Sequence, residues 1–502
     1  MTLLVTVGSI WVTPPLHSAQ LDGASYLAGA ESIGTGRGYR MVSAIGAPPI
    51  TTYPPLHSAL LSWVWRVQPE YPANLGLLHA WMQAIGIGGL LLVYFEWIRR
   101  GLPPWLAGLT GWVLGWSGCW QMVTVFCMAE PLFLLLVGAM AGWYWRRPND
   151  ADPGWRAARW WLGLGCLAAL MYLARSAAAG IIGGILVAGV WGGGLRRGRN
   201  LAGFVLPVGA AVALWAIQPK SPQGGYLAYL VSRWEELGGA SGAVRLGLEQ
   251  IWEHLGGQSF VGLLSDALAR IPDARRIRST PLSGAAQGIQ IIAGLGTMAL
   301  AVRGYLVGRS RGDAGVLTVI GFYLLQLVVW PFAMGSRAAI FLVPWVVRWV
   351  WRGWTSLGWV SKKPALHLCL PAIVLAGMAI SNLLFARMTL NPSLEKEAME
   401  LAAIGRWIRE NVPATEIVGT GVSGFDLYCA VGRPLLSGSG DEPPRRCDPV
   451  PQDPSLRARF LVVRTGSTQA QSPEWEVRME HGNFQVLSRR LPGNKGPIET
   501  HR

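Results

Sequence analysis

The chain has 502 residues, of which 51% are hydrophobic and only 14% are charged. Soluble globular domains carry roughly 25% charged residues, so this composition excludes an ordinary soluble enzyme and predicts a protein built for a lipid bilayer. The net charge of +15 does not indicate a nucleic-acid partner, because most Lys and Arg residues stand in short connections between apolar runs. Many of the 26 Trp residues lie near the ends of these runs, as in an interfacial aromatic belt.

Several apolar runs reach the roughly 20 residues that cross a bilayer core. The first run, MTLLVTVGSIWV, is short for a span and lacks the basic region and cleavage site of a signal peptide. We therefore expect the first helix to begin upstream of this start. The fold class predicted is a polytopic α-helical membrane protein with about eleven transmembrane helices, at 1–13, 76–98, 103–122, 125–145, 160–175, 177–194, 201–217, 284–302, 315–334, 337–352 and 366–386.

Five connections between these spans are basic, and alternate threading places all five on one side of the membrane. The positive-inside rule identifies that side as cytoplasmic. We expect a multi-pass protein of the inner (plasma) membrane with a cytoplasmic N-terminus. The basic residues are Arg99 and Arg100; Arg146, Arg147, Arg156 and Arg159; Arg196, Arg197 and Arg199; Arg303, Arg309 and Arg311; Arg352, Lys362 and Lys363.

The same threading places segments 14–75, 218–283 and 387–502 outside the membrane. The first contains two apolar pieces too short to span, which predict helices lying along the membrane surface. The second predicts two or three amphipathic helices that cover the mouth of a cavity. The third is polar, with helical periodicity in EKEAMELAAIGRWIREN and buried strands predicted at EIVGTG, RFLVVRTG and FQVLSRR. We expect a small extracytoplasmic α/β domain at 387–502 beside a transmembrane domain at 1–386.

The six cysteines indicate no zinc site, because they form neither a Cys-X-X-Cys pair nor a His/Cys cluster. Cys429 and Cys447 both lie in the expected outer domain, where an oxidising compartment would allow them to pair, and the sequence leaves that bridge open. The other four lie in apolar spans and are interpreted as core residues: Cys119, Cys127, Cys166 and Cys369.

Two carboxylates stand at the outer ends of apolar segments. Asp22 follows the first segment, where partial desolvation can raise a carboxylate pKa into the range of a general base. It can also be a helix N-cap or a solvated loop residue. Glu130, in VFCMAEPLFLLL, is an ionisable residue in an apolar run and hence a functional candidate, or a simple cap before Pro131. Glu31 is interpreted as a solvent-facing helical acid.

Arg175 and Arg337 lie at outer span boundaries, where two planar guanidinium groups could bind a polyprenyl phosphate. The alternative is snorkelling to lipid headgroups. In YPPLHSALL the two prolines fix an extended entry into a helix. Tyr53 and His57 are candidates for substrate contact, and His57 could also act in proton transfer or have a structural role. Weaker candidates for substrate contact are Arg37, Tyr39 and Arg40.

No phosphate-binding Gly-rich loop, GxSxG or HExxH motif is present, which makes a nucleotide-driven pump a poor fit.

At these residues the chain resembles the GT-C superfamily of polytopic glycosyltransferases, most of all its bacterial branch related to protein mannosyltransferases and the lipid A aminoarabinose transferase. The shared features span about 1–386: Asp22 before SYLAGAESIGTGRGY, then YPPLHSALL, AEPLFLLL, an Arg after the fifth span, and SRAAIFLVPW. The resemblance implies a polyprenyl-phosphate-linked sugar donor, an outward-facing site and an inverting single displacement. It also implies Asp22 as the catalytic base, with Arg175 and Arg337 near the donor phosphate.

The chain departs from the pattern of these relatives at two positions. Gly23 follows Asp22 where many relatives have Glu, which removes a second acid beside the expected base. Ala338 follows Arg337 where many have Tyr, which weakens the assignment of Arg337.

We therefore expect a membrane glycosyltransferase that moves a hexosyl or pentosyl group to an extracytoplasmic lipid, glycan or protein. The alternative is a lipid or sugar transporter or flippase, although transporters place ionisable residues near the bilayer midplane and often contain inverted repeats. A third hypothesis is a non-catalytic envelope-assembly protein. No cofactor is expected, and a divalent metal stays open because Asp22 and Glu130 could in principle meet at an ion. The sugar, the acceptor and the oligomeric state also stay open.

Overall fold

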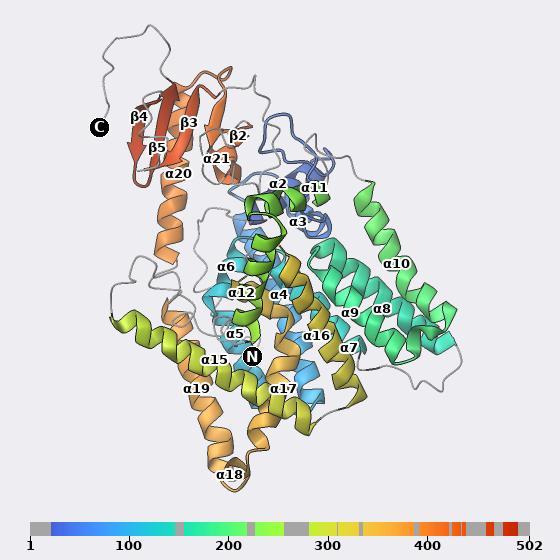
Figure 1. The fold of residues 1–502 in the computed structure, drawn as a ribbon. Helices are drawn as coiled ribbons and strands as arrows, with labels where there is room; N and C mark the ends of the chain where they lie inside the picture. The colour runs from blue at the N-terminus through green and yellow to red at the C-terminus, as the bar shows by residue number, and fades with distance from the viewer. Residues whose placement is uncertain are drawn as a thin grey trace.

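The computed structural model shows a largely helical protein with a small sheet near its C-terminus (Figure 1). The expected span at 1–13, the partner cysteine Cys447 and the segment 256–280 lie outside the described residues. The residues that the structure describes are 22–144, 146, 155–217, 226–255, 281–308, 310–330, 335–385, 391–420, 424–432, 434–437, 458–465 and 475–489.

Two short helices, α2 (Asp22–Gly34) and α3 (Leu56–Val67), lie in segment 14–75, which the sequence predicts to be outside the membrane and which we call the first outer segment. At 1.5 Å per residue, helices of this length fall short of a bilayer core. They pack closely because α2 presents glycine to α3: a Cβ on Gly34 would lie 2.7 Å from the Cβ of Trp65. The hydroxyl of Ser58 on α3 also donates to the Tyr26 carbonyl on α2 at 3.0 Å.

Four helices of the described chain are long and apolar enough to cross a membrane, or five if the bent pair α6–α7 counts as one span. The count of about eleven spans stays a prediction. Further apolar stretches, at Ala178–Trp191, Ile291–Val307 and Leu368–Ile380, are shorter. The four long helices are α4 (Leu75–Arg99), α8 (Trp155–Ala174), α10 (Gly198–Ala216) and α16 (Arg311–Val329).

The expected span at 103–122 is wrong at its C-terminal end. Helix α5 (Pro104–Trp116) stops at Ser117, whose hydroxyl accepts from the Trp120 N–H at 3.2 Å and so caps a new helix, α6 (Gly118–Val125). A tight turn follows, and α7 (Glu130–Tyr144) leaves it at an angle of 111° to α6. The break places Glu130 at the first turn of α7 instead of inside a continuous span.

The expected span at 337–352 is also broken. A 3₁₀ segment, η3 (Gly335–Phe341), precedes α17 (Val343–Thr355), and Pro344 stands in the first turn of α17, where its missing N–H costs nothing. The remaining helices of this region are α9 (Ala178–Trp191), η1 (Gly194–Arg196), α15 (Pro281–Val307), α18 (Gly358–Ser361) and α19 (Pro364–Phe385).

The described part of segment 218–283, the second segment that the sequence predicts to be outside the membrane, forms two helices, α11 (Tyr226–Glu236) and α12 (Ala240–Leu255). Helix α12 packs on α16, where a Cβ on Gly247 would lie 2.2 Å from the Val328 carbonyl oxygen. The indole N–H of Trp234 on α11 donates to the Val329 carbonyl at 3.0 Å. Both helices therefore cover the C-terminal end of α16.

The C-terminal region contains helices and a mixed sheet, and the three strands predicted from the sequence are β1, β3 and β5 of that sheet. Its order is β2-β1-β3-β5-β4, with β1 parallel to β2 and β3 and with β5 antiparallel to β3 and β4. Helix α20 buries Ala398, Leu401, Ile404 and Ile408, the face that its periodicity predicted. The elements are α20 (Asn391–Asn411), β1 (Val418–Thr420), α21 (Gly424–Val431), β2 (Leu436–Ser437), β3 (Phe460–Arg464), β4 (Trp475–His481) and β5 (Phe484–Arg489).

This region is joined to the first outer segment by two sets of polar contacts. The Tyr428 hydroxyl donates to Glu31 Oε1 at 2.9 Å, and Arg37 pairs with the same oxygen at 2.8 Å. Leu435 exchanges backbone hydrogen bonds with the loop 43–45, at 3.0 and 3.2 Å. Burial and the nearby Glu31 carboxylate raise the pKa of Tyr428, which stays a donor at neutral pH. The expectation that Glu31 faces solvent is wrong, because its side chain is 14% exposed.

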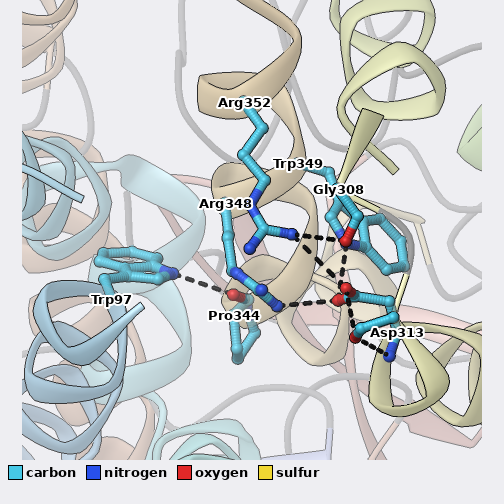
Figure 2. A network of polar contacts seen from close by, with 8 residues as sticks. Trp97, Gly308, Asp313, Pro344, Arg348, Trp349 and Arg352 are labelled. Atoms are coloured by element: carbon cyan, nitrogen blue, oxygen red, sulfur yellow. Dashed lines mark hydrogen bonds and ion pairs between the residues drawn. The ribbon is translucent and has the colours of Figure 1, made fainter. Parts of the chain in front are cut away.

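A buried ion cluster joins α16 to α17 (Figure 2). Asp313, fully buried, pairs with Arg348 at 2.8 Å and Arg352 at 3.4 Å. Ser310 caps α16 by accepting from the Asp313 N–H at 3.1 Å and donates its hydroxyl to the carboxylate at 2.8 Å. Nearby, the Trp97 indole of α4 donates to the Pro344 carbonyl at 3.0 Å. Carboxylate, cap and arginines together fix how these helices meet.

Replacing Asp313 with Asn keeps the shape of the side chain and leaves Arg348 buried without its counter-charge. Removing one partner of a buried ion pair costs about 3–5 kcal/mol. We expect the free energy of unfolding to fall by about that amount, seen as a lower midpoint of thermal unfolding in detergent. The control is Glu249→Gln, which breaks an exposed pair with Arg245 worth about 0.3–0.5 kcal/mol. Equal losses in both variants would contradict a structural role for Asp313.

Candidate functional site

Four charged side chains from distant parts of the chain meet beside α2. Arg337 Nη1 lies 3.4 Å from Asp22 Oδ2 and 3.4 Å from Glu130 Oε1. Arg175 Nη1 pairs with the same Glu130 oxygen. Asp22 begins α2, Glu130 begins α7, Arg175 follows the last residue of α8, and Arg337 lies in η3. We call these four residues the charge cluster; its two positive and two negative charges balance.

Burial separates the two carboxylates of the charge cluster. The Glu130 side chain is 2% exposed and lies between Arg175 and Arg337, so it is their internal counter-ion. The Asp22 side chain, at 23% exposed, is the most open member of the cluster. A molecule arriving from solvent can therefore reach Asp22 but not Glu130.

The Asp22 carboxylate is oriented by groups on both of its oxygens. The Tyr53 hydroxyl donates to Oδ1 at 2.9 Å, while Oδ2 faces Arg337. Tyr53 is held in turn, because its carbonyl accepts from the Tyr39 hydroxyl at 3.1 Å and its ring packs 5.1 Å from the Tyr26 ring. Tyr26 was missed by sequence reasoning, although its spacing of four residues from Asp22 places both on one helix face.

Gly23 explains why a second acid is absent after Asp22. A Cβ at Gly23 would lie 1.7 Å from the Phe126 carbonyl oxygen and 2.9 Å from its carbonyl carbon. The start of α2 therefore lies directly on the turn between α6 and α7. Only glycine permits this approach, which brings Asp22 close to the Glu130 end of α7.

His57 lies beside the charge cluster but is fully buried. Burial lowers its pKa to about 4, so the ring is neutral at pH 7. A carbonyl can only accept a hydrogen bond, so His57 Nε2–H donates to the Cys127 oxygen at 2.8 Å. Cys127 has a positive φ of 52° in the turn before α7. These contacts favour the structural alternative for His57, as a support of the turn that carries Glu130.

The weaker candidates lie around this centre. Tyr39 supports Tyr53 as described, Arg37 pairs with Glu31, and Arg40 donates to the Ala47 carbonyl at 3.2 Å. Met128 was missed altogether: its sulfur lies 3.8 Å from Arg337 Nη1. Nothing in the local sequence pattern distinguishes this methionine.

A metal site was left open by the sequence. Within the described ranges, no three His, Cys, Asp or Glu side chains converge as metal ligands would. Asp22 and Glu130, which could in principle have met at an ion, both contact Arg337 Nη1.

Comparison with solved structures identifies the fold. The chain is similar to ArnT from Cupriavidus metallidurans bound to undecaprenyl phosphate, with a TM-score of 0.62 over 99% of both chains at 13% identity. The fold is that of the GT-C glycosyltransferases. The GT-C fold is shared with the oligosaccharyltransferase AglB from Archaeoglobus fulgidus, in complex with an inhibitory peptide and a dolichol-phosphate. That match has a TM-score of 0.52 over 92% of this chain and 69% of AglB at 12% identity.

No protein-family model matches the chain, and no curated protein matches it in sequence. At 12–13% identity the structural likeness establishes the fold alone. It confirms the fold that the sequence resemblance implied. The activity has to be argued from the chemistry of the site.

Replacing Gly23 with Ala should push α2 away from the α6–α7 turn, because the added methyl group meets a backbone carbonyl. Overpacking of this kind costs about 1–3 kcal/mol, so we expect a lower midpoint of thermal unfolding. The control is Gly76→Ala, since a Cβ at Gly76 in α4 meets no atom within 4 Å and alanine favours the helix. A Gly23→Ala variant as stable as the Gly76→Ala variant would contradict the close approach.

Proposed function

We propose that the protein is an integral-membrane glycosyltransferase that moves a sugar from a polyprenyl-phosphate-linked donor to an extracytoplasmic acceptor by inverting displacement. The observation that carries this proposal is the Asp22 carboxylate, oriented by Tyr53 and in contact with Arg337, which shares Glu130 with a second arginine, Arg175. A partly open carboxylate suits a base, and adjacent arginines suit a phosphate leaving group.

In the proposed reaction, a hydroxyl or amine of the acceptor attacks C1 of the donor sugar. Asp22 takes the acceptor proton as the new bond forms, and the bond between C1 and the phosphate oxygen breaks. The electron pair leaves with the polyprenyl phosphate, which gains one negative charge. Attack from the face opposite the leaving group inverts the configuration at C1.

Arg337 and Arg175 would stabilise the charge that grows on the departing phosphate. Fixed cations are most effective where charge develops in the transition state, and a guanidinium presents five N–H donors in a planar fork. Glu130 is then a positioning residue that holds both arginines at the site. Tyr53 orients the base, and His57 supports the turn before Glu130.

The comparisons support a lipid phosphate as the donor. The ArnT structure holds undecaprenyl phosphate, and the AglB structure holds a dolichol-phosphate together with an inhibitory peptide. For this chain we propose the same donor class, with a lipid, glycan or protein as the acceptor. The tail of the donor would lie among the apolar helices, and water would be kept from the sugar by α2, α3 and α11.

The proposed site faces away from the cytoplasm. The basic connections favour this orientation in an inner or plasma membrane with about eleven spans, the shorter apolar helices contributing crossings beyond the four or five long ones. The region after 386 would then be an extracytoplasmic domain. Its contacts from Tyr428 and Leu435 to the first outer segment support a position of this domain near the proposed acceptor.

Replacing Asp22 with Asn should abolish turnover, because the amide cannot take the acceptor proton. Loss of a general base costs roughly 10²–10⁴-fold in rate. The measurement is acceptor-dependent release of polyprenyl phosphate from a panel of synthetic polyprenyl-phosphate sugars by the purified protein. The control is Glu70→Gln, at an exposed acid of the same outer segment, which should leave the rate unchanged.

Full turnover by the folded Asp22→Asn variant would contradict the role of Asp22. Donor binding without turnover by the wild type across the panel would contradict the enzyme itself and favour a flippase. A flippase would be identified by movement of the intact lipid across a vesicle membrane at a rate that Asp22→Asn does not change.

A further inference from the structure

An apolar cavity of about 310 Å³ lies between α5, α15, α17 and α19, within the range of small-molecule sites. Its only hydroxyl groups belong to Thr110 and Thr297, and each donates to a carbonyl of its own helix at 2.8 Å. Neither hydroxyl group therefore needs a partner from outside its own helix. A cavity of this character stays dry and accepts hydrocarbon.

The cavity is flanked by lipid-facing surface. On α19, Leu370 and Val374 line the cavity and are also 40% and 48% exposed, and the neighbouring Ile373 is 68% exposed. Exposed aliphatic side chains on a helix of a membrane protein face lipid. A hydrocarbon chain can thus enter the cavity from the bilayer along α19.

One end of the cavity is basic and aromatic. Arg303 stands one helical turn after the lining residue Leu300 and is held in place by donating to the Ser356 hydroxyl and carbonyl at 2.7 and 2.9 Å. Lys362 and Lys363, both exposed, precede α19. Trp354 lines the cavity and packs edge-on against the exposed Trp359 at 5.4 Å.

The positive charge at this end has no acidic counterpart on the helices that line it. Between residues 281 and 385 the sequence contains a single acid, Asp313, and that carboxylate is buried against Arg348 and Arg352. Helix α18, next to the two lysines, lies at the end of the molecule opposite the sheet (Figure 1). The basic end is therefore remote from the outer domain.

We propose that this cavity binds one acyl chain of an anionic phospholipid whose phosphate lies against Arg303, Lys362 and Lys363. Basic groups between membrane helices bind anionic headgroups, and tryptophan prefers the headgroup level. Leu370, which lines the cavity, follows Lys363 by seven residues, about 10 Å along a helix. This distance between the basic residues and the cavity suits the separation of headgroup and acyl chain in a phospholipid. The site is independent of the charge cluster, because the sugar donor of the proposed reaction needs its phosphate at Arg337.

The test is native mass spectrometry of the full-length protein, with phosphatidylglycerol and phosphatidylcholine of matched acyl chains. We expect phosphatidylglycerol to be retained preferentially. The triple variant Arg303→Gln, Lys362→Gln, Lys363→Gln should lose this preference by roughly tenfold or more, since each basic residue near a headgroup contributes to binding. The control is Arg196→Gln, Arg197→Gln, Arg199→Gln, which removes three charges from another basic connection and should keep the preference.

A second variant tests the chain-binding part. Thr110→Phe fills the cavity and leaves every basic residue in place, and it should also release the lipid. Equal retention of both phospholipids by the wild type, or an unchanged preference in the first triple variant, would overturn the proposal. Displacement of phosphatidylglycerol by an equal amount of polyprenyl phosphate would overturn it too, because the cavity would then belong to the donor tail.

Discussion

The arrangement of the charge cluster depends on one guanidinium group. Arg337 lies between Asp22 and Glu130, and through Glu130 it is linked to Arg175, so four elements far apart in the sequence share one set of ion pairs. A buried charge lowers the stability of the fold unless it is paired with an opposite charge. Removing one member of the cluster would therefore leave another buried charge unpaired. The charge cluster therefore fixes the positions of α2, α7, η3 and the end of α8 together.

Steric contacts and neutral hydrogen bonds bring these charges within reach of each other. Gly23 lets α2 lie against the Phe126 carbonyl, and His57 holds the following turn through Cys127. The result is an asymmetric pair of acids: a buried Glu130 that organises the arginines, and a more open Asp22 aligned by Tyr53. In the proposed reaction, this division would let Asp22 act as the base while Glu130 keeps the two arginines in place. In the same way, the ion pairs of Asp313 with Arg348 and Arg352 hold α16 against α17.

Much of the local structure could be predicted from the sequence. Helix α20 follows from its periodicity, because it buries one face, and strands β1, β3 and β5 follow from apolar runs, because consecutive residues in them are buried. The breaks at Ser117 and before Pro344 were missed, since composition alone does not show where a cap ends a helix. The sequence grouped Arg175 with Arg337 and Asp22 with Glu130. The pairing of arginine with acid was not predictable, because Arg337 and Glu130 are 207 residues apart. The role of Gly23 likewise depends on a distant carbonyl.

The most direct test of this account is a structure of the protein with a polyprenyl phosphate bound. The account predicts phosphate oxygens at about 3 Å from guanidinium nitrogens of Arg337 or Arg175, with Glu130 still paired and the Asp22 carboxylate beside the vacant sugar position. A phosphate bound elsewhere, for example at Arg303 and Lys363, with the charge cluster unchanged, would contradict the assignment of the outer site.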